Sequence, residues 1–260
     1  MTNQIIQGDC LEVMPLIADK SIDMILCDLP YGTTACKWDT IIPFEPLWEQ
    51  YKRIIKDNGA IVLTASQPFT SALVMSNIKM FKYELIWDKQ LTSGFLNANR
   101  MPLRSHEDIL VFYKKQPIYN PQKVMGNKNH SKGKMTSDTN NDYGKYGKVD
   151  NTEQLGYMKH PKSIISFEKP HPSKSIHPTQ KPVALFEYLI KTYTNEGDLV
   201  LDNCAGSFTT AIASENLKRN WICIEKEAEY CAIGEKRIKE NREHLHNIDT
   251  RDITLIPPEN

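Results

Sequence analysis

The chain has 260 residues, which is enough for one large domain or for one core domain with a sizeable insertion. Apolar residues make up 40% of it and charged residues 25%, a composition that is typical of globular proteins and excludes a wholly disordered chain. No apolar run has the length of a membrane span, and the first residues lack a basic start followed by an apolar stretch, so we expect neither a transmembrane protein nor a secretory signal.

Charge is balanced over the whole chain but not along it. There are 32 basic and 32 acidic residues, yet residues 114–181 contain 13 lysines and only five acids, so this segment carries +8 and the remainder −8. A polyanion bound on one face would fit this asymmetry, and a solvated lysine-rich loop fits it equally well. The six cysteines include no C-x-x-C pair, so we expect buried free thiols in a reducing cytoplasm and no metal site.

Short apolar runs alternate with helical stretches along the chain, which predicts an α/β fold with a parallel sheet. The expected strands are Gln4–Gln7, Asp23–Cys27, Ala60–Thr64, Tyr83–Trp87, Asp108–Tyr113, Leu199–Leu201 and Asn220–Ile224. The expected helices are Leu11–Ile17, Pro46–Ile55, Pro68–Ile78, Pro182–Thr192, Thr209–Asn216 and Glu227–Glu243. Residues 120–172 show almost no periodicity, so we expect an insertion there that is ordered only partly without a partner.

Two motifs with an acid follow predicted strands in the first half of the chain. Asp9 comes after the first strand and can cap the next helix, or it can accept a hydrogen bond from an adenine amine; capping alone is the simpler interpretation. The sequence Asp28-Leu29-Pro30-Tyr31 follows the second strand, at the strand end where parallel sheets bind ligands. There the carboxylate can accept hydrogen bonds from an amine and the tyrosine can stack on a base, although a capped turn with a packed tyrosine is the structural alternative.

Two further motifs lie near the other end. A strand ends in Asp202, a loop of small residues leads to a helix near Thr209, and the next strand ends in Glu225. This βαβ arrangement favours a nucleoside whose ribose hydroxyls bind Glu225, and because G-x-G-x-x-G is missing, a pyrophosphate is disfavoured; an unliganded crossover is the alternative. The segment His177-Pro178-Thr179-Gln180-Lys181-Pro182 precedes a helix, and taken alone it is a helix start after a rigid loop.

Together these motifs resemble those of the β-class amino-directed DNA methyltransferases, which methylate adenine N6 or cytosine N4. That family has, in chain order, D-P-P-Y, a target-recognition region, H-P-T-Q-K-P and D-P-F-x-G-S-G-T-T. Here the same order runs from Asp28 through the basic insertion and His177 to Asp202. The order is circularly permuted relative to an ordinary Rossmann enzyme, whose cofactor loop comes first, and the resemblance extends from about Asp9 to Arg237.

The resemblance implies a Rossmann-like S-adenosylmethionine-dependent methyltransferase fold. Residues 1–113 would be its catalytic half, 114–172 the target-recognition insertion, 173–248 the cofactor-binding half and 249–260 a tail. It implies methyl transfer from S-adenosylmethionine to an exocyclic amine of a base rotated out of double-stranded DNA. It also implies a cytoplasmic protein, and leaves a homodimer open.

The family's functional residues can be carried over by motif. The side chain of Asp28 and the backbone carbonyl of Leu29 would accept the two amine hydrogens, and Tyr31 would stack on the base. The implied catalytic set is Asp28, Leu29, Pro30 and Tyr31. The implied cofactor-binding set is Asp9, Cys10, Asp28, Lys181, Asp202, Asn203, Gly206, Ser207, Thr209, Thr210 and Glu225. The loop at residues 91–103 would lie near the flipped base, and the implied DNA contacts are Lys89, Arg100 and Arg104.

Two positions depart from the family pattern. Leu29 replaces the first proline, which costs some preorganisation but keeps the backbone carbonyl. Phe208 replaces the second glycine of G-S-G, so its ring must turn away or fill space near the methionine end of the cofactor. Asp28, rather than serine, favours adenine N6 over cytosine N4. Two other hypotheses are a catalytically silent DNA- or protein-binding relative, which Phe208 motivates, and a methyltransferase that acts on RNA or on a free nucleotide.

Overall fold

The computed structural model describes residues 2–34, 36, 39–128, 156–169 and 180–253. The chain divides into two compact units, residues 1–120 with 163–260 and residues 121–162. In the second unit, the short strands β6 (Val124–Met125) and β7 (Met158–Lys159) pair antiparallel. Among the described residues, no helix has both the length and the apolar character of a membrane span.

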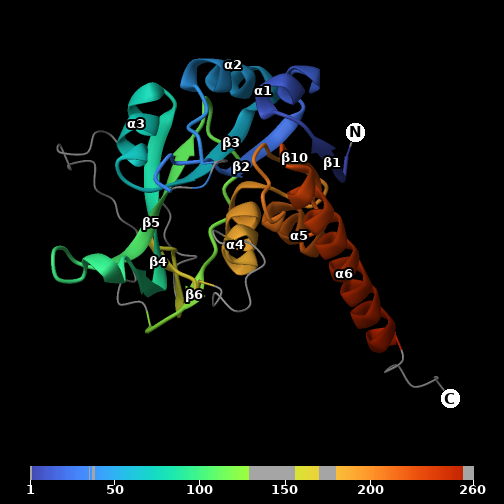
Figure 1. Cartoon of the computed structure of the whole chain (residues 1–260). Coiled ribbons are helices and arrows are strands. Elements are labelled where there is room, and N and C mark those ends of the chain that lie inside the picture. Colours follow the sequence, from blue (N-terminus) through green and yellow to red (C-terminus); the bar gives the residue numbers. More distant parts are fainter. Residues whose placement is uncertain (1, 35, 37–38, 129–155, 170–179, 254–260) are drawn as a thin grey trace, which may run out of the picture. The chain divides into compact units, whose positions relative to one another are not determined.

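The first unit is built on an eight-stranded sheet in the order β1-β10-β9-β2-β3-β5-β4-β8 (Figure 1). Its strands are β1 Gln4–Gln7, β2 Ile22–Asp28, β3 Ile55–Ala65, β4 Phe81–Ser93, β5 Arg104–Phe112, β8 Ile164–Ser166, β9 Leu199–Asp202 and β10 Asn220–Glu225. The strands from β1 to β3 are parallel, as predicted, but β5 runs antiparallel to both β3 and β4. The prediction of a parallel sheet is therefore wrong on this side, because β4 and β5 form a hairpin that needs no crossover helix.

Helices cover both faces of the sheet (Figure 1). The helices are α1 Cys10–Val13, α2 Phe44–Ile54, α3 Phe69–Ser76, α4 Val183–Tyr193, α5 Thr209–Asn216 and α6 Ala228–Ile253, with 3-10 turns η1 Met14–Leu16 and η2 Phe95–Asn97. The core on one face joins the sheet to α1, α2 and α3, and the cores on the other face join it to α4, α5 and α6. Helix α6 continues to Ile253, ten residues beyond Glu243, where the sequence predicted its end.

Strand β2 shows how the sequence produces this layered core. Ile25 and Cys27 belong to the core under α1, α2 and α3, while Met24 and Leu26 belong to the core under α4. All four side chains are fully buried, because successive residues of a strand point to opposite faces and both faces are covered. The apolar run therefore fixes the central strand that ends in Asp28.

The cysteines are free thiols, and four of the six are buried. Cys204 is half-buried, and Cys36 is exposed, so the expectation of burial is wrong for Cys36.

Candidate active site

The sheet order brings three strand-end acids to one edge. Asp28 ends β2, Asp202 ends the neighbouring β9, and Glu225 ends β10 beside it, and these strands are parallel. All three carboxylates line one cavity of about 500 Å³. That volume lies within the range of roughly 300–1,000 Å³ that is usual for small-molecule sites. Residues far apart in the sequence thus meet where an open α/β sheet normally binds its ligand.

Most of the residues singled out from the sequence line this cavity. They are Asp9, Cys10, Asp28, Leu29, Pro30, Tyr31, Lys89, Arg104, Lys181, Asp202, Asn203, Gly206, Ser207, Thr209 and Glu225. Two do not: Thr210 is buried behind the wall, where its hydroxyl donates to Asp202 Oδ2 at 2.5 Å, and Arg100 lies in the exposed connection between β4 and β5. His177, Pro178 and Thr179 lie outside the described residues, as does the middle of the basic insertion.

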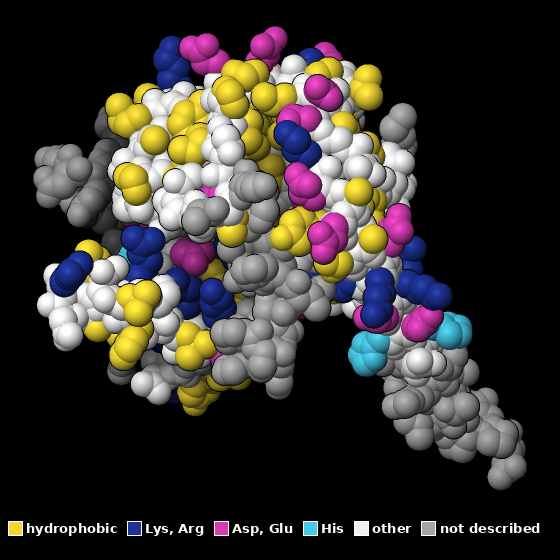
Figure 2. All heavy atoms as spheres, in the orientation of Figure 1, with side chains coloured by type: hydrophobic (Ala, Val, Ile, Leu, Met, Phe, Trp, Pro, Cys, Tyr) yellow, Lys and Arg dark blue, Asp and Glu magenta, His cyan; other side chains and the backbone are white. Residues whose placement is uncertain are grey.

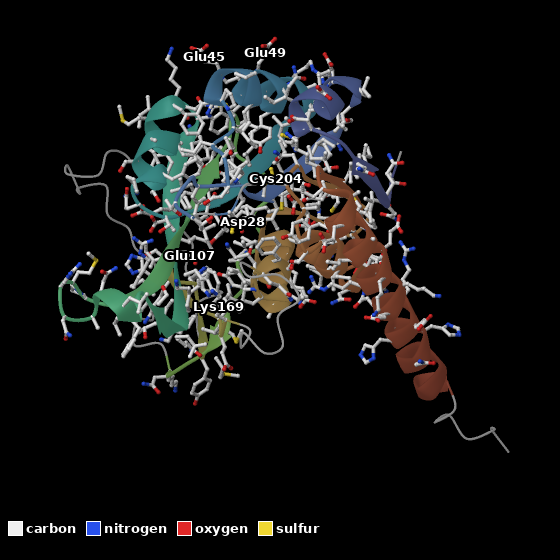
Figure 3. The ribbon with its side chains drawn as sticks, viewed as in Figure 1. Asp28, Glu45, Glu49, Glu107, Lys169 and Cys204 are labelled. Atoms are coloured by element: carbon white, nitrogen blue, oxygen red, sulfur yellow. The ribbon has the colours of Figure 1, made fainter. Side chains whose placement is uncertain are left out.

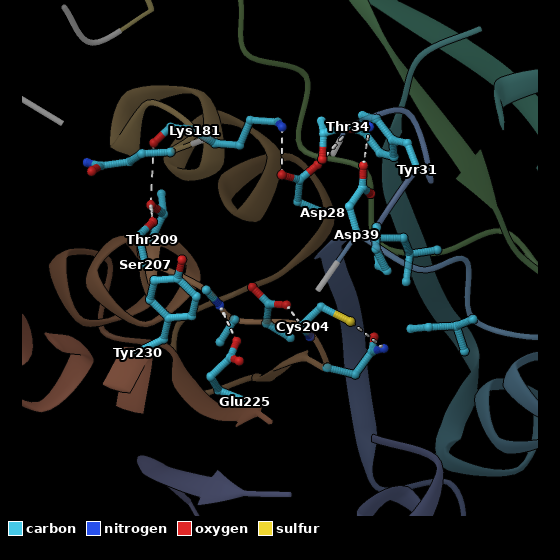
Figure 4. A pocket seen from close by; sticks show the side chains of 18 of the residues that line it. Asp28, Tyr31, Thr34, Asp39, Lys181, Cys204, Ser207, Thr209, Glu225 and Tyr230 are labelled. Carbon is cyan, nitrogen blue, oxygen red and sulfur yellow. Dashed lines mark hydrogen bonds and ion pairs between the residues drawn. The ribbon is translucent and has the colours of Figure 1, made fainter. Parts of the chain in front are cut away.

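The carboxylate of Asp28 is held by three side chains. Lys181 Nζ donates to Asp28 Oδ2 at 2.6 Å, and the Tyr31 hydroxyl donates to Oδ1 at 2.7 Å (Figure 4). The hydroxyl of Thr64 donates to the same Oδ1, because the register of β2 and β3 places Thr64 directly beside Asp28. The orientation of this carboxylate is therefore fixed before any substrate arrives.

Buried charges continue beyond Asp28. Lys181 Nζ lies 3.3 Å from Glu107 Oε2, and Lys89 Nζ lies 3.3 Å from Glu107 Oε1. Burial opposes charge on Lys181, but Asp28 and Glu107 raise its pKa well above the usual value. Burial also opposes the charge on Glu107 and by itself would raise its pKa, but the neighbouring cations Lys181 and Lys89 hold that pKa below the ordinary value. The four side chains thus form a neutral row of alternating charges, in the order Asp28, Lys181, Glu107 and Lys89. Figure 3 shows where this row lies, with Asp28 between Glu107 and Cys204.

Glu107 was not predicted as a site residue, although an acid at the start of the apolar segment of β5 was a usable signal. The structure also corrects the role given to Lys89. This lysine is buried and its ammonium bonds to Glu107, so it forms part of the cavity wall and does not face phosphates on the surface. Arg104 is exposed, and its Nη1 donates to the Ser66 hydroxyl at 2.6 Å.

The turn that follows Asp28 is shaped by two residues that the sequence did not single out. The Tyr31 ring stacks on Phe69, with ring centroids 5.3 Å apart and planes at 27°. The Asp39 carboxylate accepts the backbone N–H groups of Gly32, Thr33 and Thr34 at 2.8, 2.9 and 2.7 Å. Burial raises the pKa of Asp39, but these hydrogen bonds outweigh it and lower the pKa overall. The turn is therefore preorganised on both sides of Tyr31.

At the other end of the cavity, Glu225 fixes the small-residue loop. Its Oε2 accepts the Gly206 N–H at 2.8 Å and its Oε1 accepts the Glu227 N–H at 2.9 Å (Figure 4). A carboxylate has about four acceptor positions, so Glu225 keeps capacity for hydroxyl donors. Asp9 caps α1 by accepting the Leu11 N–H at 3.0 Å, and its other oxygen pairs with Lys226 at 3.1 Å.

Phe208 turns away from the cavity. It adopts φ 61°, a left-handed conformation normally suited to glycine, and its ring is fully buried in the core beneath α6. Space for the ring comes from Gly234 of α6, because a Cβ at that position would lie 2.2 Å from a ring carbon of Phe208. Of the two outcomes expected for this side chain, the structure therefore shows the one that leaves the cavity open.

The pKa of Asp202 gives a pH-dependent prediction. Burial raises this pKa from 3.8 to about 6, against the hydrogen bonds from Thr210 and the Cys204 N–H, which lower it. The folded protein therefore keeps a proton that the unfolded chain loses near pH 4. Because the folded state binds more protons in this range, the contribution of Asp202 makes the free energy of unfolding fall as the pH rises from about 4 to just above 6. A shift of this size corresponds to about 3 kcal/mol.

Asp202→Asn should remove that component. Urea unfolding of both proteins across this pH range should show the wild type losing about 3 kcal/mol relative to the variant. Stability profiles that stay parallel would show that Asp202 is ionised in the folded protein at its ordinary pKa.

Comparison with known proteins gives the family. The model of the N6/N4 DNA methylase family matches residues 22–236. The chain belongs to this DNA methylase family. It is 28% identical to the DNA adenine methyltransferase YhdJ of Escherichia coli over 252 residues, which cover 90% of this chain and 82% of YhdJ. The predicted family is thus confirmed.

Two solved structures extend the comparison to the fold. The M1.HpyAVI–SAM complex superposes with a TM-score of 0.60 at 26% identity, covering 90% of this chain and 98% of that one. The cytosine-N4-specific PvuII DNA methyltransferase superposes with a TM-score of 0.63 at 16% identity, covering 94% and 92%, which shows the fold alone. The predicted α/β fold of a DNA methylase is thus confirmed, with a sheet that is mixed and not wholly parallel. The predicted cofactor of the family, S-adenosylmethionine, is confirmed as well.

Proposed function

We propose that this DNA methylase transfers a methyl group from S-adenosylmethionine to adenine N6 of a base rotated out of duplex DNA. The observation that carries the proposal is the shared cavity, in which the Asp28-Leu29-Pro30-Tyr31 turn faces the strand-end acids Asp202 and Glu225. Adenine is favoured by Asp28 in the catalytic motif and by the similarity to an adenine methyltransferase.

The residues present fit the cofactor. The cavity is large enough for a nucleoside with an amino-acid tail, and its Ala205-Gly206-Ser207 loop leaves room for a ligand to approach the backbone. Glu225 would accept the ribose hydroxyls, and Asp9, already positioned as a cap, would accept from the adenine amine. Asn203 and Asp202 would line the methionine end. When bound, S-adenosylmethionine supplies an electrophilic methyl group on a sulfonium.

Catalysis would consist of holding the target amine in line with that methyl group. Asp28 Oδ2, which already accepts from Lys181, retains a position for one amine hydrogen, and the Leu29 carbonyl would accept the second. These two acceptors would aim the nitrogen lone pair at the methyl carbon. The cofactor would supply the methyl group for a new bond to the amine nitrogen, the positive charge that this leaves on the amine would lie beside the Asp28 carboxylate, and the surplus proton would pass to water.

The DNA contacts and the division of the chain are also part of the proposal. Residues 114–172 are rich in lysine and lie, in the sequence, between the catalytic half and the cofactor half. This segment would recognise the target site in the DNA. Arg100 and Arg104 would contact phosphates, since both are exposed. The circularly permuted order of the motifs agrees with this assignment.

Labelled methyl transfer tests the proposed reaction and its target. The protein is incubated with methyl-tritiated S-adenosylmethionine and mixed-sequence duplex DNA, the DNA is digested to nucleosides, and the label is located by chromatography. We expect the label in N6-methyladenine, with little transfer to single-stranded RNA in the same assay. Label in N4-methylcytosine would show a cytosine enzyme, and no label together with no cofactor binding would show a catalytically silent relative.

A further inference from the structure

The connection between β4 and β5 carries a group of exposed apolar side chains. Phe95 is 80% exposed, Leu96 is 97% exposed, and Met101, later in the same connection, is 58% exposed. Gly94, with φ 89°, provides the turn into the short η2 helix that presents the first two. Single exposed leucines are common on proteins, but several large apolar side chains at the tip of a projection indicate a binding surface. Figure 2 shows hydrophobic and basic side chains together on this hairpin.

The base of the hairpin forms part of the active-site wall. Lys89 and Ser93 of β4 line the cavity, as do Arg104 and Glu107 of β5. Ser93 pairs with Arg104 in the ladder, and the hydrogen bond from Arg104 to Ser66 ties the hairpin to the residue that follows β3. The apolar tip therefore extends from an anchored ribbon directly beside the Asp28 cavity.

The charge of this hairpin favours one kind of partner. Residues 90–104 contain the exposed Arg100 and Arg104 and no acid. A polyanion is attracted to such a segment, and among polyanions, duplex DNA also offers an apolar interior between its base pairs. A hairpin that carries exposed apolar side chains and exposed arginines matches a partner with phosphates on its outside and stacked bases inside.

We propose that Phe95 and Leu96 enter the duplex and occupy the space that the target base leaves when it rotates into the cavity. This inference rests on the proposed function and adds the residues that displace the base. Rotation costs a few kcal/mol of lost pairing and stacking, and apolar side chains inserted between the remaining bases recover part of that cost. The two side chains act on the DNA and do not touch the reacting atoms.

A double variant, Phe95→Ala with Leu96→Ala, tests this role. The substrates are two duplexes that carry the site methylated by the wild type, one fully paired and one with a mismatch opposite the target base. We expect transfer by the variant to fall by about tenfold or more on the paired duplex and to recover to near the wild-type rate on the mismatched one, where the base is already unpaired. With 2-aminopurine at the target position, the fluorescence rise on binding should shrink in the same variant.

The matched control is Met75→Ala with Ile78→Ala, two side chains that are 71% and 56% exposed near the end of α3. It should behave as the wild type on both duplexes. Equal loss on both duplexes, or no loss, would overturn the proposal. Loss of a dimer in light scattering, together with the activity, would instead assign the tip to contact between two copies of this chain. Absence of transfer by the wild type itself would refute the proposed function, and this inference with it.

Discussion

Asp28→Ala is expected to lower kcat for methyl transfer by at least about 100-fold, while DNA still binds. The Asp28 carboxylate lies at the start of the catalytic turn, where Lys181, Tyr31 and Thr64 hold it. Its removal takes away both an acceptor for the amine hydrogen and the negative charge beside the developing cation. The measurement is single-turnover transfer with saturating cofactor, which separates the chemical step from binding.

Two comparison variants make this result specific. Asp28→Asn keeps an acceptor oxygen but not the charge, so its rate should lie between those of the wild type and the alanine variant. Asp57→Ala removes an exposed acid that pairs only with surface lysines in the described structure, and it should leave the rate unchanged. A folded Asp28→Ala protein that retains more than about one tenth of the wild-type rate would contradict the assigned role.

Gly234→Ala is expected to destabilise the protein by about 1–3 kcal/mol, because the new methyl group would overlap the buried ring of Phe208. The sign is informative. Alanine is the better helix former, and in α6 it would otherwise stabilise the protein by about 1 kcal/mol. Cofactor affinity should fall as well, since Phe208 stands between Ser207 and Thr209 of the cavity wall. Urea unfolding and calorimetry measure the two effects.

The same change in a Phe208→Ala background serves as the control. Without the ring, Gly234→Ala should be neutral or stabilising, so the double-mutant cycle should show strong coupling between the two positions. Additive effects would mean that the ring and Gly234 are not in contact. In that case Phe208 would have to be placed elsewhere, and the open cavity would lose its explanation.

The strand ends at the active site could be predicted from the sequence because β2, β9 and β10 are apolar runs that each end in an acid. Asp28, Asp202 and Glu225 are all strand-end residues, and parallel strands bring such residues to one edge. The antiparallel β5 could not be predicted in this way, since apolar alternation gives the faces of a strand but not its direction. Helix α6 was predicted too short, because only three apolar residues follow Glu243 within it, Leu245, Ile248 and Ile253, and they give no clear helical periodicity.

The contacts that complete the site were harder to foresee because they join distant positions. Lys181 was expected at the cofactor and lines the proposed cofactor cavity, but the sequence did not indicate that its ammonium also pairs with Asp28 and Glu107. Phe208 was the most serious departure from the family pattern, and what accommodates it is a glycine in another helix. A glycine within a helix gives no local signal of the side chain it makes room for, so this compensation appears only in three dimensions.

A crystal structure with a non-reactive S-adenosylmethionine analogue tests the central claim most directly. The claim predicts that the analogue occupies the cavity with its ribose hydroxyls on Glu225, its adenine edge near Asp9 and its sulfur-equivalent end pointing toward Asp28. An analogue bound outside this cavity, or bound with its methyl-bearing end directed away from Asp28, would contradict the account.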